Sequence, residues 1–182
     1  MRPAQLALAE MLQKYAIRTG DFTLASGRKS SWYLDGRMVT FRGDCVQIVG
    51  RAVVEALSAA GIDEYDAVGG LVVGAVPVAV AVAAVSGVRS FAVRKEAKEH
   101  GAGGMIAGPL ETTDRVIVVE DTVTSGGSVL QALRAVQDFG AEVVAVATLL
   151  DRGGELEALL AAEGVAYVPT LVAPELGFAF GS

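Results

Sequence analysis

The segment Val116–Ser128, which reads VIVVEDTVTSGGS, constrains the fold of this chain more than any other feature. Its β-branched apolar residues, Val116–Val119, are typical of a buried strand and run directly into Glu120 and Asp121. A short loop of hydroxyl residues and glycines follows, and the apolar spacing then changes to that of a helix. This order predicts two adjacent carboxylates at the carboxyl end of a strand, beside the N-terminus of a helix.

The loop of this segment is suited to a phosphate group. The backbone N–H groups of Thr124–Ser128 are expected at a helix N-terminus, where unpaired donors and the helix dipole stabilise an anion. Carboxylates alone would repel a phosphate, so the combination fits a ligand that carries both sugar hydroxyls and a phosphate, with a metal nearby. The alternative is an ordinary strand–turn–helix in which Thr124 or Ser125 caps the helix and the carboxylates are solvated.

Helix-like and strand-like segments alternate along the centre of the chain, which predicts an α/β fold with a mostly parallel sheet flanked by helices. The expected helices cover residues 44–60, 78–85, 128–139 and 155–162, and the expected strands cover residues 65–70, 88–93, 115–120, 143–150 and 165–171. Ligands in such folds bind beyond the carboxyl ends of the strands. We therefore expect one site built from the residues at these ends: Glu120, Asp121, the turn at 74–77, Arg94 and Arg152.

Composition and charge exclude several classes of protein. The 182 residues, of which 52% are hydrophobic, predict a single folded domain covering residues 1–182. The net charge of −6 argues against a nucleic-acid partner. Cys45 is the single cysteine, so no disulfide framework and no cysteine-based metal site is expected, and its apolar surroundings predict a buried side chain.

Two segments look like membrane or export signals and are interpreted otherwise. Residues 67–88 carry no charge, but their glycines and Pro77 favour a strand, a turn and a buried helix over a membrane span. The N-terminal stretch MRPAQLALAEMLQKY lacks a long apolar core and predicts an amphipathic helix, not a signal peptide. We therefore expect a cytoplasmic protein with no membrane partner.

Two further segments fall outside the alternation of strands and helices. Residues 18–40 contain two strand-like pieces joined by a polar turn, which predicts a hairpin that forms a small separate lobe. Residues 95–115 are polar and rich in glycine. A connection of this length inside a compact domain is usually a lid or a binding loop, so we expect a mobile catalytic loop here.

Residues 116–128 resemble the ribose-phosphate signature of the type I phosphoribosyltransferases. That signature is a hydrophobic strand, two acids, two variable residues, Thr or Ser, any residue, Gly, any residue, and Thr or Ser. The resemblance implies this family's fold and assigns the following residues to phosphoribosyl pyrophosphate: Glu120, Asp121, Thr122, Val123, Thr124, Ser125, Gly126, Gly127 and Ser128. It also implies Mg²⁺ held by the substrate, and through water by Glu120 and Asp121, with no confident direct protein ligand.

The segment RKEAKEHG, residues 94–101, resembles the catalytic loop of the orotate-specific branch of this family. The resemblance assigns Arg94, Lys95, Lys98 and His100 to the pyrophosphate, and Lys98, His100 and Asp121 to catalysis. It further implies a homodimer in which this loop reaches the site of the neighbouring subunit. The alternative is a solvated run of charges.

The segment FTLASGRKSSWYLD, residues 22–35, resembles the hood that covers the planar base in the same branch. The alternative is a plain hairpin in which Trp32 and Tyr33 belong to a buried aromatic cluster. The chain departs from the branch at Ala25, where many members have Lys, and no Lys precedes the 74–77 turn. These two cationic contacts are then absent or supplied elsewhere, for example by Arg28 or Lys29.

Arg152 follows an apolar strand in the sequence LDRGG, and its planar guanidinium can bind a carboxylate through two N–H groups. The resemblance assigns Arg152, together with Thr124, to orotate. The alternative is a surface arginine paired with Asp151 or Glu155.

The resemblance as a whole implies a pentosyltransferase of de novo pyrimidine (UMP) biosynthesis that forms orotidine 5′-monophosphate and pyrophosphate from orotate and phosphoribosyl pyrophosphate. Two alternatives remain from the residues themselves. A purine phosphoribosyltransferase would share residues 116–128 but would have no use for an arginine aimed at a carboxylate. A non-catalytic sensor of phosphoribosyl pyrophosphate would usually need a nucleic-acid surface or an added domain, which the acidic charge and short chain argue against.

Overall fold

The fold, a computed structural model, is described for residues 1–23, 29–98 and 104–180. Its helices are α1 (Pro3–Met11), α2 (Arg37–Thr40), α3 (Val46–Ala59), α4 (Ala75–Ser86), α5 (Gly127–Phe139) and α6 (Leu156–Ala162). Its strands are β1 (Ile17–Thr23), β2 (Lys29–Leu34), β3 (Ala67–Leu71), β4 (Arg89–Lys98), β5 (Gly104–Ala107), β6 (Arg115–Val123), β7 (Glu142–Asp151) and β8 (Ala166–Val172). A π-helical turn, Leu12–Ala16, continues α1, and a 3₁₀ turn, Ala173–Leu176, follows β8.

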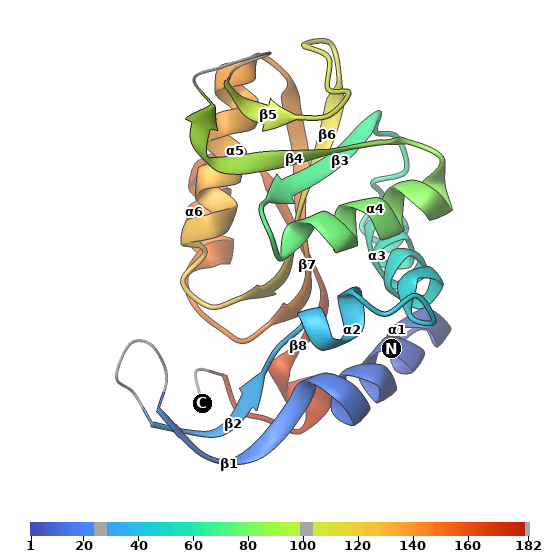
Figure 1. Cartoon of the computed structure of the whole chain (residues 1–182), viewed down its shortest axis with the longest axis vertical. Helices are drawn as coiled ribbons and strands as arrows, with labels where there is room; N and C mark the ends of the chain where they lie inside the picture. The colour runs from blue at the N-terminus through green and yellow to red at the C-terminus, as the bar shows by residue number, and fades with distance from the viewer. Residues whose placement is uncertain (24–28, 99–103, 181–182) are drawn as a thin grey trace.

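The strands form two separate sheets. The larger sheet has the order β5-β4-β3-β6-β7-β8, and each neighbouring pair is parallel except β4 and β5 (Figure 1). Strands β1 and β2 pair with each other as an antiparallel hairpin. The predicted α/β class with a mostly parallel sheet and a small N-terminal addition is therefore confirmed.

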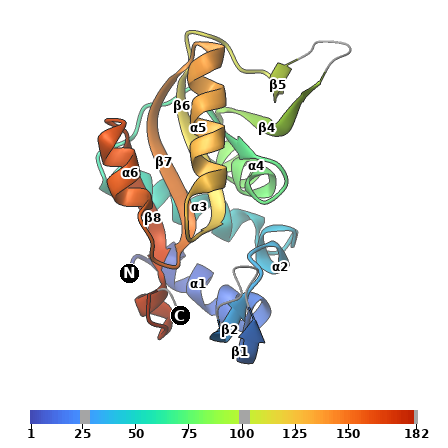
Figure 2. The same cartoon turned by 90° about the vertical axis from the view of Figure 1, so that its left-hand side faces the viewer.

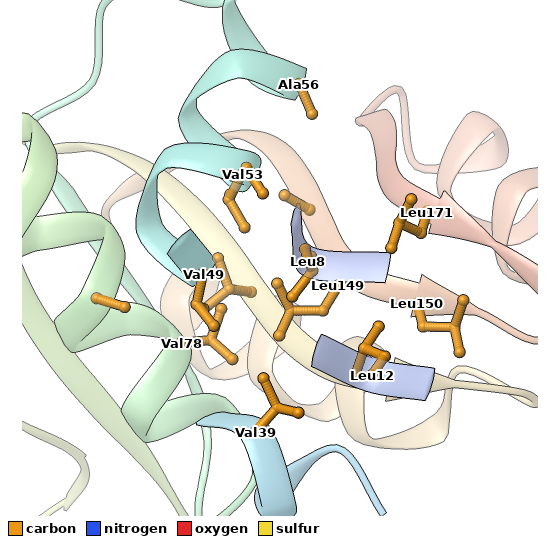
Figure 3. Packing of buried hydrophobic residues seen from close by; sticks show 14 of the residues in the cluster. Leu8, Leu12, Val39, Val49, Val53, Ala56, Val78, Leu149, Leu150 and Leu171 are labelled. Atoms are coloured by element: carbon orange, nitrogen blue, oxygen red, sulfur yellow. The ribbon is translucent and has the colours of Figure 1, made fainter. Parts of the chain in front are cut away.

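Alternation of side chains divides the core between the two faces of the large sheet. In β6, Ile117 and Val119 belong to the cluster packed by α1, α3 and α4, whereas Val116 and Val118 belong to the cluster packed by α5 and α6. Figure 3 shows the first cluster, where leucines of the N-terminal helix meet valines of α3 and α4 and leucines of β7 and β8. Because both faces are covered, the strands read as continuous apolar runs.

Three elements differ by three or more residues from their predicted bounds. Helix α4 begins at Ala75, three residues before the predicted start at residue 78, and Pro77 lies in its first turn as the sequence suggested. Strand β6 continues past the acids to Val123, because Thr122 and Val123 still pair with Leu150 and Asp151 of β7. Strand β4 continues to Lys98 and pairs with β5, so part of the expected 95–115 loop is an antiparallel hairpin. The mobility of this segment stays a prediction.

The order of the strands places a cleft where the direction of winding reverses. The chain proceeds from β3 outward to β4, and then from β6 outward to β7 and β8 on the other side. Connections diverge at the carboxyl ends of β3 and β6, which leaves a crevice between them. Both predicted acids lie at the end of β6, so the topology brings them to this crevice.

The N-terminal hairpin lies near the end of the large sheet where the carboxyl ends of its parallel strands meet (Figure 2). Strand β2 alternates between buried and exposed residues, so Trp32 and Leu34 face the interior and Tyr33 faces outward. Cys45 is buried with a free thiol, as expected. Within the described residues, no helix combines the length and apolarity that crossing a membrane would require. The cytoplasmic location stays a prediction.

Candidate functional site

A cleft of about 310 Å³ opens at the switch point of the sheet. The ends of β3 and β6 form its floor, and residues of the N-terminal hairpin, β4 and α5 form its walls. It is lined by Tyr33, Leu34, Asp35, Gly36, Arg37, Leu71, Val72, Val73, Gly74, Lys95, Glu120, Asp121, Thr122 and Ser128. A larger cavity lies at the other end of the sheet, where β3 and β6 begin, near Asp63 and Arg115. It contains none of the predicted site residues.

Glu120 and Asp121 meet at the floor of this cleft as a strongly interacting pair. The backbone N–H of Asp121 donates to Oε1 of Glu120 at 3.1 Å, and the N–H of Thr122 donates to Oδ1 of Asp121 at 2.7 Å. Burial, and then the charge of Asp121, raise the pKa of Glu120 to about 8. Burial likewise raises the pKa of Asp121, against the lowering effect of the Thr122 hydrogen bond. A ligand that neutralises or hydrogen-bonds these carboxylates would therefore relieve an unfavourable concentration of charge.

Glycines allow the backbone to approach the acid pair closely. A Cβ at Gly74 would lie 2.9 Å from Oδ1 of Asp121, and a Cβ at Gly36 would lie 3.1 Å from its Oδ2. The turn after β3 and the start of α2 thus press against the same carboxylate from different elements. The 74–77 turn contributes to the cleft as predicted, although only Gly74 of that range lines it.

An ion pair missed by the sequence prediction borders the acids. Arg37 donates from Nε and Nη2 to the two carboxylate oxygens of Asp35, at 2.8 and 3.0 Å. Asp35 raises the pKa of Asp121 and Arg37 lowers it, in each case less than burial and the local hydrogen bonds do. The position of Asp35 just after an apolar strand was an available signal, whereas nothing in the pattern singles out Arg37.

The loop between β6 and α5 has the geometry expected of a phosphate cradle. Helix α5 begins at Gly127, and Gly126 precedes it with a φ of +79°. Thr124, Ser125 and Ser128 are exposed, whereas the side chain of Val123 is buried and is not available to a ligand. Gly154 supports the loop from below, because a Cβ there would lie 1.9 Å from the carbonyl oxygen of Thr124.

The cationic segment is only partly placed at the cleft. Lys95 lines it, and its carbonyl oxygen accepts a hydrogen bond from Gln131 at 2.9 Å. Arg94 instead donates to the carbonyl oxygens of Gly104 and Ile106 at 3.0 and 2.8 Å, so it holds β5 against β4. Lys98 ends β4, and His100 lies outside the described residues. The assignments of Arg94, Lys95, Lys98 and His100 to pyrophosphate stay predictions.

Arg152 lies at the end of β7, next to the end of β6, and does not line the 310 Å³ cleft. The residue is 9% exposed, which argues against the surface location that the alternative of a pair with Asp151 or Glu155 assumed. Its guanidinium carbon lies 4.2 Å from the ring centroid of Trp32. Asp151, one of the partners considered for it, accepts a hydrogen bond from the N–H of Gly153 at 2.7 Å.

Among the described residues, no cluster of three or more His, Cys, Asp or Glu side chains could enclose a metal ion. The two carboxylates at the cleft floor are nevertheless the hard oxygen ligands that Mg²⁺ prefers. A pair of carboxylates without a third protein ligand suits a metal that keeps waters and is also bound by substrate phosphates. The carboxylates of Glu120 and Asp121 therefore fit a hard divalent cation.

Comparisons with known proteins agree with these features. A model of the phosphoribosyl transferase domain matches residues 45–162. The orotate phosphoribosyltransferase of Corynebacterium glutamicum (strain R) is 42% identical over 176 residues, which cover 96% of this chain and 94% of that protein. The orotate phosphoribosyltransferase of Mycobacterium tuberculosis H37Rv is 42% identical over 177 residues, 96% of this chain and 97% of that protein.

A crystal structure of the Mycobacterium tuberculosis H37Rv enzyme in complex with 5-phospho-alpha-D-ribosyl 1-diphosphate superposes with a TM-score of 0.81 and 38% sequence identity. The match covers 97% of this chain and 100% of that one. The likeness therefore extends over the hood hairpin, the sheet and the C-terminal segment together.

Proposed function

The chain belongs to the orotate phosphoribosyltransferases, within the phosphoribosyl transferase domain family, and on this basis we propose that it transfers the phosphoribosyl group of phosphoribosyl pyrophosphate to orotate. The products are orotidine 5′-monophosphate and pyrophosphate, and the reaction belongs to pyrimidine (UMP) biosynthesis. The observation that carries the proposal is the pair Glu120–Asp121 at the floor of a cleft that also borders the N-terminus of α5.

The acid pair suits the ribose of phosphoribosyl pyrophosphate. Its carboxylates can accept hydrogen bonds from ribose hydroxyls, and their negative charge favours the positive charge that develops on the ribose as pyrophosphate leaves. The N–H groups of the Thr124–Ser128 loop would hold the 5′-phosphate. Lys95 at the wall, with Lys98 and His100 from the cationic segment, would stabilise the charge growing on the pyrophosphate.

Magnesium belongs to this proposal as a partner of the substrate. Glu120 and Asp121 would hold it through water, and it would neutralise phosphate charge when bound. The chain's own contribution is to place two carboxylates, raised in pKa by burial, where a cation favours their ionised form.

The hood hairpin and Arg152 are proposed to hold the base. Tyr33 lines the cleft and is 40% exposed, so its ring is available to cover a planar ligand, whereas the fully buried Trp32 is not. Thr124, and Arg152 through its fork of N–H donors, would contact the orotate ring and carboxylate. The planar guanidinium can bind a carboxylate through two N–H groups, which supports a carboxylate-bearing base over a purine.

We also propose that the enzyme is a homodimer in which residues 94–101 act on the neighbouring site. Large apolar side chains are exposed on segments next to the cleft, at Met38, Phe41, Val73 and Val80, and a second copy would cover them. Strands β4 and β5 extend away from the body of the molecule (Figure 2), which supports a contact between this part of the chain and a neighbouring subunit.

A parallel assay with four bases tests the proposed function. Purified protein with phosphoribosyl pyrophosphate and Mg²⁺ should consume orotate, followed by its ultraviolet absorption, and leave uracil, hypoxanthine and adenine unchanged. Turnover of hypoxanthine or adenine would favour the purine alternative. Binding of phosphoribosyl pyrophosphate without turnover of any base, seen as a thermal shift, would favour a sensor.

A substitution at Ser128 tests the phosphate cradle. Ser128→Asp places a negative charge at the N-terminus of α5, which stabilises the helix but repels a phosphate. We expect calorimetry to show at least a roughly tenfold loss of affinity for phosphoribosyl pyrophosphate, with a melting temperature equal to or above that of wild type. Ser58→Asp is the matched control for the added charge, because Ser58 is exposed on α3 and does not line the cleft. Unchanged affinity in Ser128→Asp would place the 5′-phosphate elsewhere.

A further inference from the structure

The guanidinium of Arg152 rests on an aromatic support made by Trp32 and Phe178, residues far apart in the sequence. Its carbon lies 4.2 Å from the Trp32 ring centroid. The ring of Phe178 stacks on Trp32 with centroids 4.3 Å apart and planes inclined by 16°. Trp32 is fully buried, so this support is part of the packed interior and is not a surface contact.

The segments that carry Arg152 and Trp32 are both tied to elements that line the cleft. The N–H of Arg152 donates to the carbonyl oxygen of Val123 at 3.0 Å, which fixes its backbone to the strand that carries the acid pair. On β2, Trp32 faces inward beneath Arg152 while its neighbour Tyr33 faces the cleft. One short strand thus bears both a wall of the cleft and the platform for the arginine.

The C-terminal segment closes over the turn that follows Arg152. It leaves the 3₁₀ turn at Gly177, with a φ of +87°, and places Phe178 against Trp32. Gly153 must lack a side chain, because its φ is +86° and a Cβ there would lie 2.6 Å from Cβ of Phe180. The C-terminal segment therefore packs directly against the turn that carries Arg152.

We propose that Trp32 and Phe178 are positioning residues that hold the guanidinium of Arg152 in the orientation needed to grip the carboxylate of the base. An arginine side chain has several rotatable bonds, and a guanidinium held over a ring keeps its in-plane N–H groups available for a bidentate contact. Pre-ordering the side chain removes the entropy loss that would otherwise accompany binding. This inference rests on the proposed function, since it assumes that Arg152 contacts orotate.

Steady-state kinetics separate this positioning role from a merely structural one. For Trp32→Leu we expect the Michaelis constant for orotate to rise roughly tenfold, while that for phosphoribosyl pyrophosphate changes less than about twofold. Phe178→Leu should give a smaller rise, about threefold, and Trp32→Phe should restore most of the wild-type value. Tyr15→Leu is the matched control: Arg42 lies 4.0 Å from the Tyr15 ring centroid, and neither residue lines the cleft. It should lower the melting temperature without raising the orotate constant.

A double substitution decides whether the effect passes through Arg152. In an Arg152→Ala background, Trp32→Leu should cause no further rise in the orotate constant, because the group that it positions is already gone. The inference would be overturned if Trp32→Leu raised the Michaelis constant for orotate equally with and without Arg152→Ala. It would also be overturned if Trp32→Leu alone did not raise that constant. Wild-type protein that does not turn over orotate would instead refute the proposed function, so the two failures are distinguishable.

Trp32 also supplies a binding signal that does not need activity, since it is the only tryptophan in the chain. Binding of orotidine 5′-monophosphate should change the fluorescence of Trp32. The indole is excited at the red edge of its absorption band, and the signal is corrected for absorption by the ligand. Uridine 5′-monophosphate, which lacks the carboxylate, should change it much less, and Arg152→Ala should remove the difference. Equal signals from the two nucleotides in wild type would show that the carboxylate does not reach Arg152 on its support, and would overturn the inference.

Discussion

Glu120→Gln should make the unliganded protein more stable at alkaline pH and nearly inactive. The carboxyl of Glu120 ordinarily has a pKa of 4.5, but in the folded protein burial and Asp121 raise it to about 8. Between these pH values the folded state therefore retains a proton that the unfolded state has lost. The free energy of unfolding of wild type consequently falls as pH rises from about 4.5 to about 8, by up to roughly 4 kcal/mol.

Glutamine at position 120 has no such titration, so its stability curve should be flatter and lie above that of wild type at the alkaline end. Urea unfolding at a series of pH values measures the difference, and Glu163→Gln, an exposed glutamate beyond α6, is the control. Parallel curves for wild type and Glu120→Gln would mean that the carboxyl is not held neutral by the fold.

The same substitution should lower kcat/KM for phosphoribosyl pyrophosphate more than about a hundredfold, because the negative charge is lost where the ribose becomes positive. A substitution that raises stability and lowers activity is expected where the functional residues of a site reduce the stability of the folded state. Near-normal turnover in Glu120→Gln would remove this residue from the mechanism.

The sequence alone was sufficient for the elements whose local pattern and tertiary packing agree. Residues 116–119 form a buried strand because every side chain there is apolar and both faces of the sheet are covered. The acids that follow were correctly placed at its carboxyl end. The three extra residues of β6 were not predicted, since polar side chains at a strand end give no sign that the backbone still pairs with β7.

The contacts that the sequence could not supply are those made between distant segments. Arg94 stands beside Lys95 in a run of charges, yet one holds β5 and the other lines the cleft, because neighbours on a strand face opposite ways. The stacking of Trp32 on Phe178 joins the second strand to the C-terminal segment. No periodicity links the two residues, so only the folded chain reveals that the tail supports Arg152.

The homodimer proposal leads to a result that no single-chain arrangement would give. Lys98→Ala and Asp121→Ala should each be nearly inactive alone, because both sites of each dimer lack one essential group. Asp121 lies in the cleft of its own subunit, whereas Lys98, the last residue of β4, is proposed to act on the neighbouring site. In a mixed dimer both defects then fall in one site, and the other site has an intact strand and an intact loop.

Unfolding and refolding the two variants together forms mixed dimers as about half of the population, each with one working site. Activity should therefore recover to about a quarter of the wild-type value in a closed twofold assembly. Glu120→Gln refolded with Asp121→Ala is the matched control. Both residues line the same cleft, so every site of that mixed dimer keeps one defect and no activity should return. If the Lys98 and Asp121 variants also fail to recover, with mixed dimers confirmed by mass spectrometry, the loop must act within its own subunit.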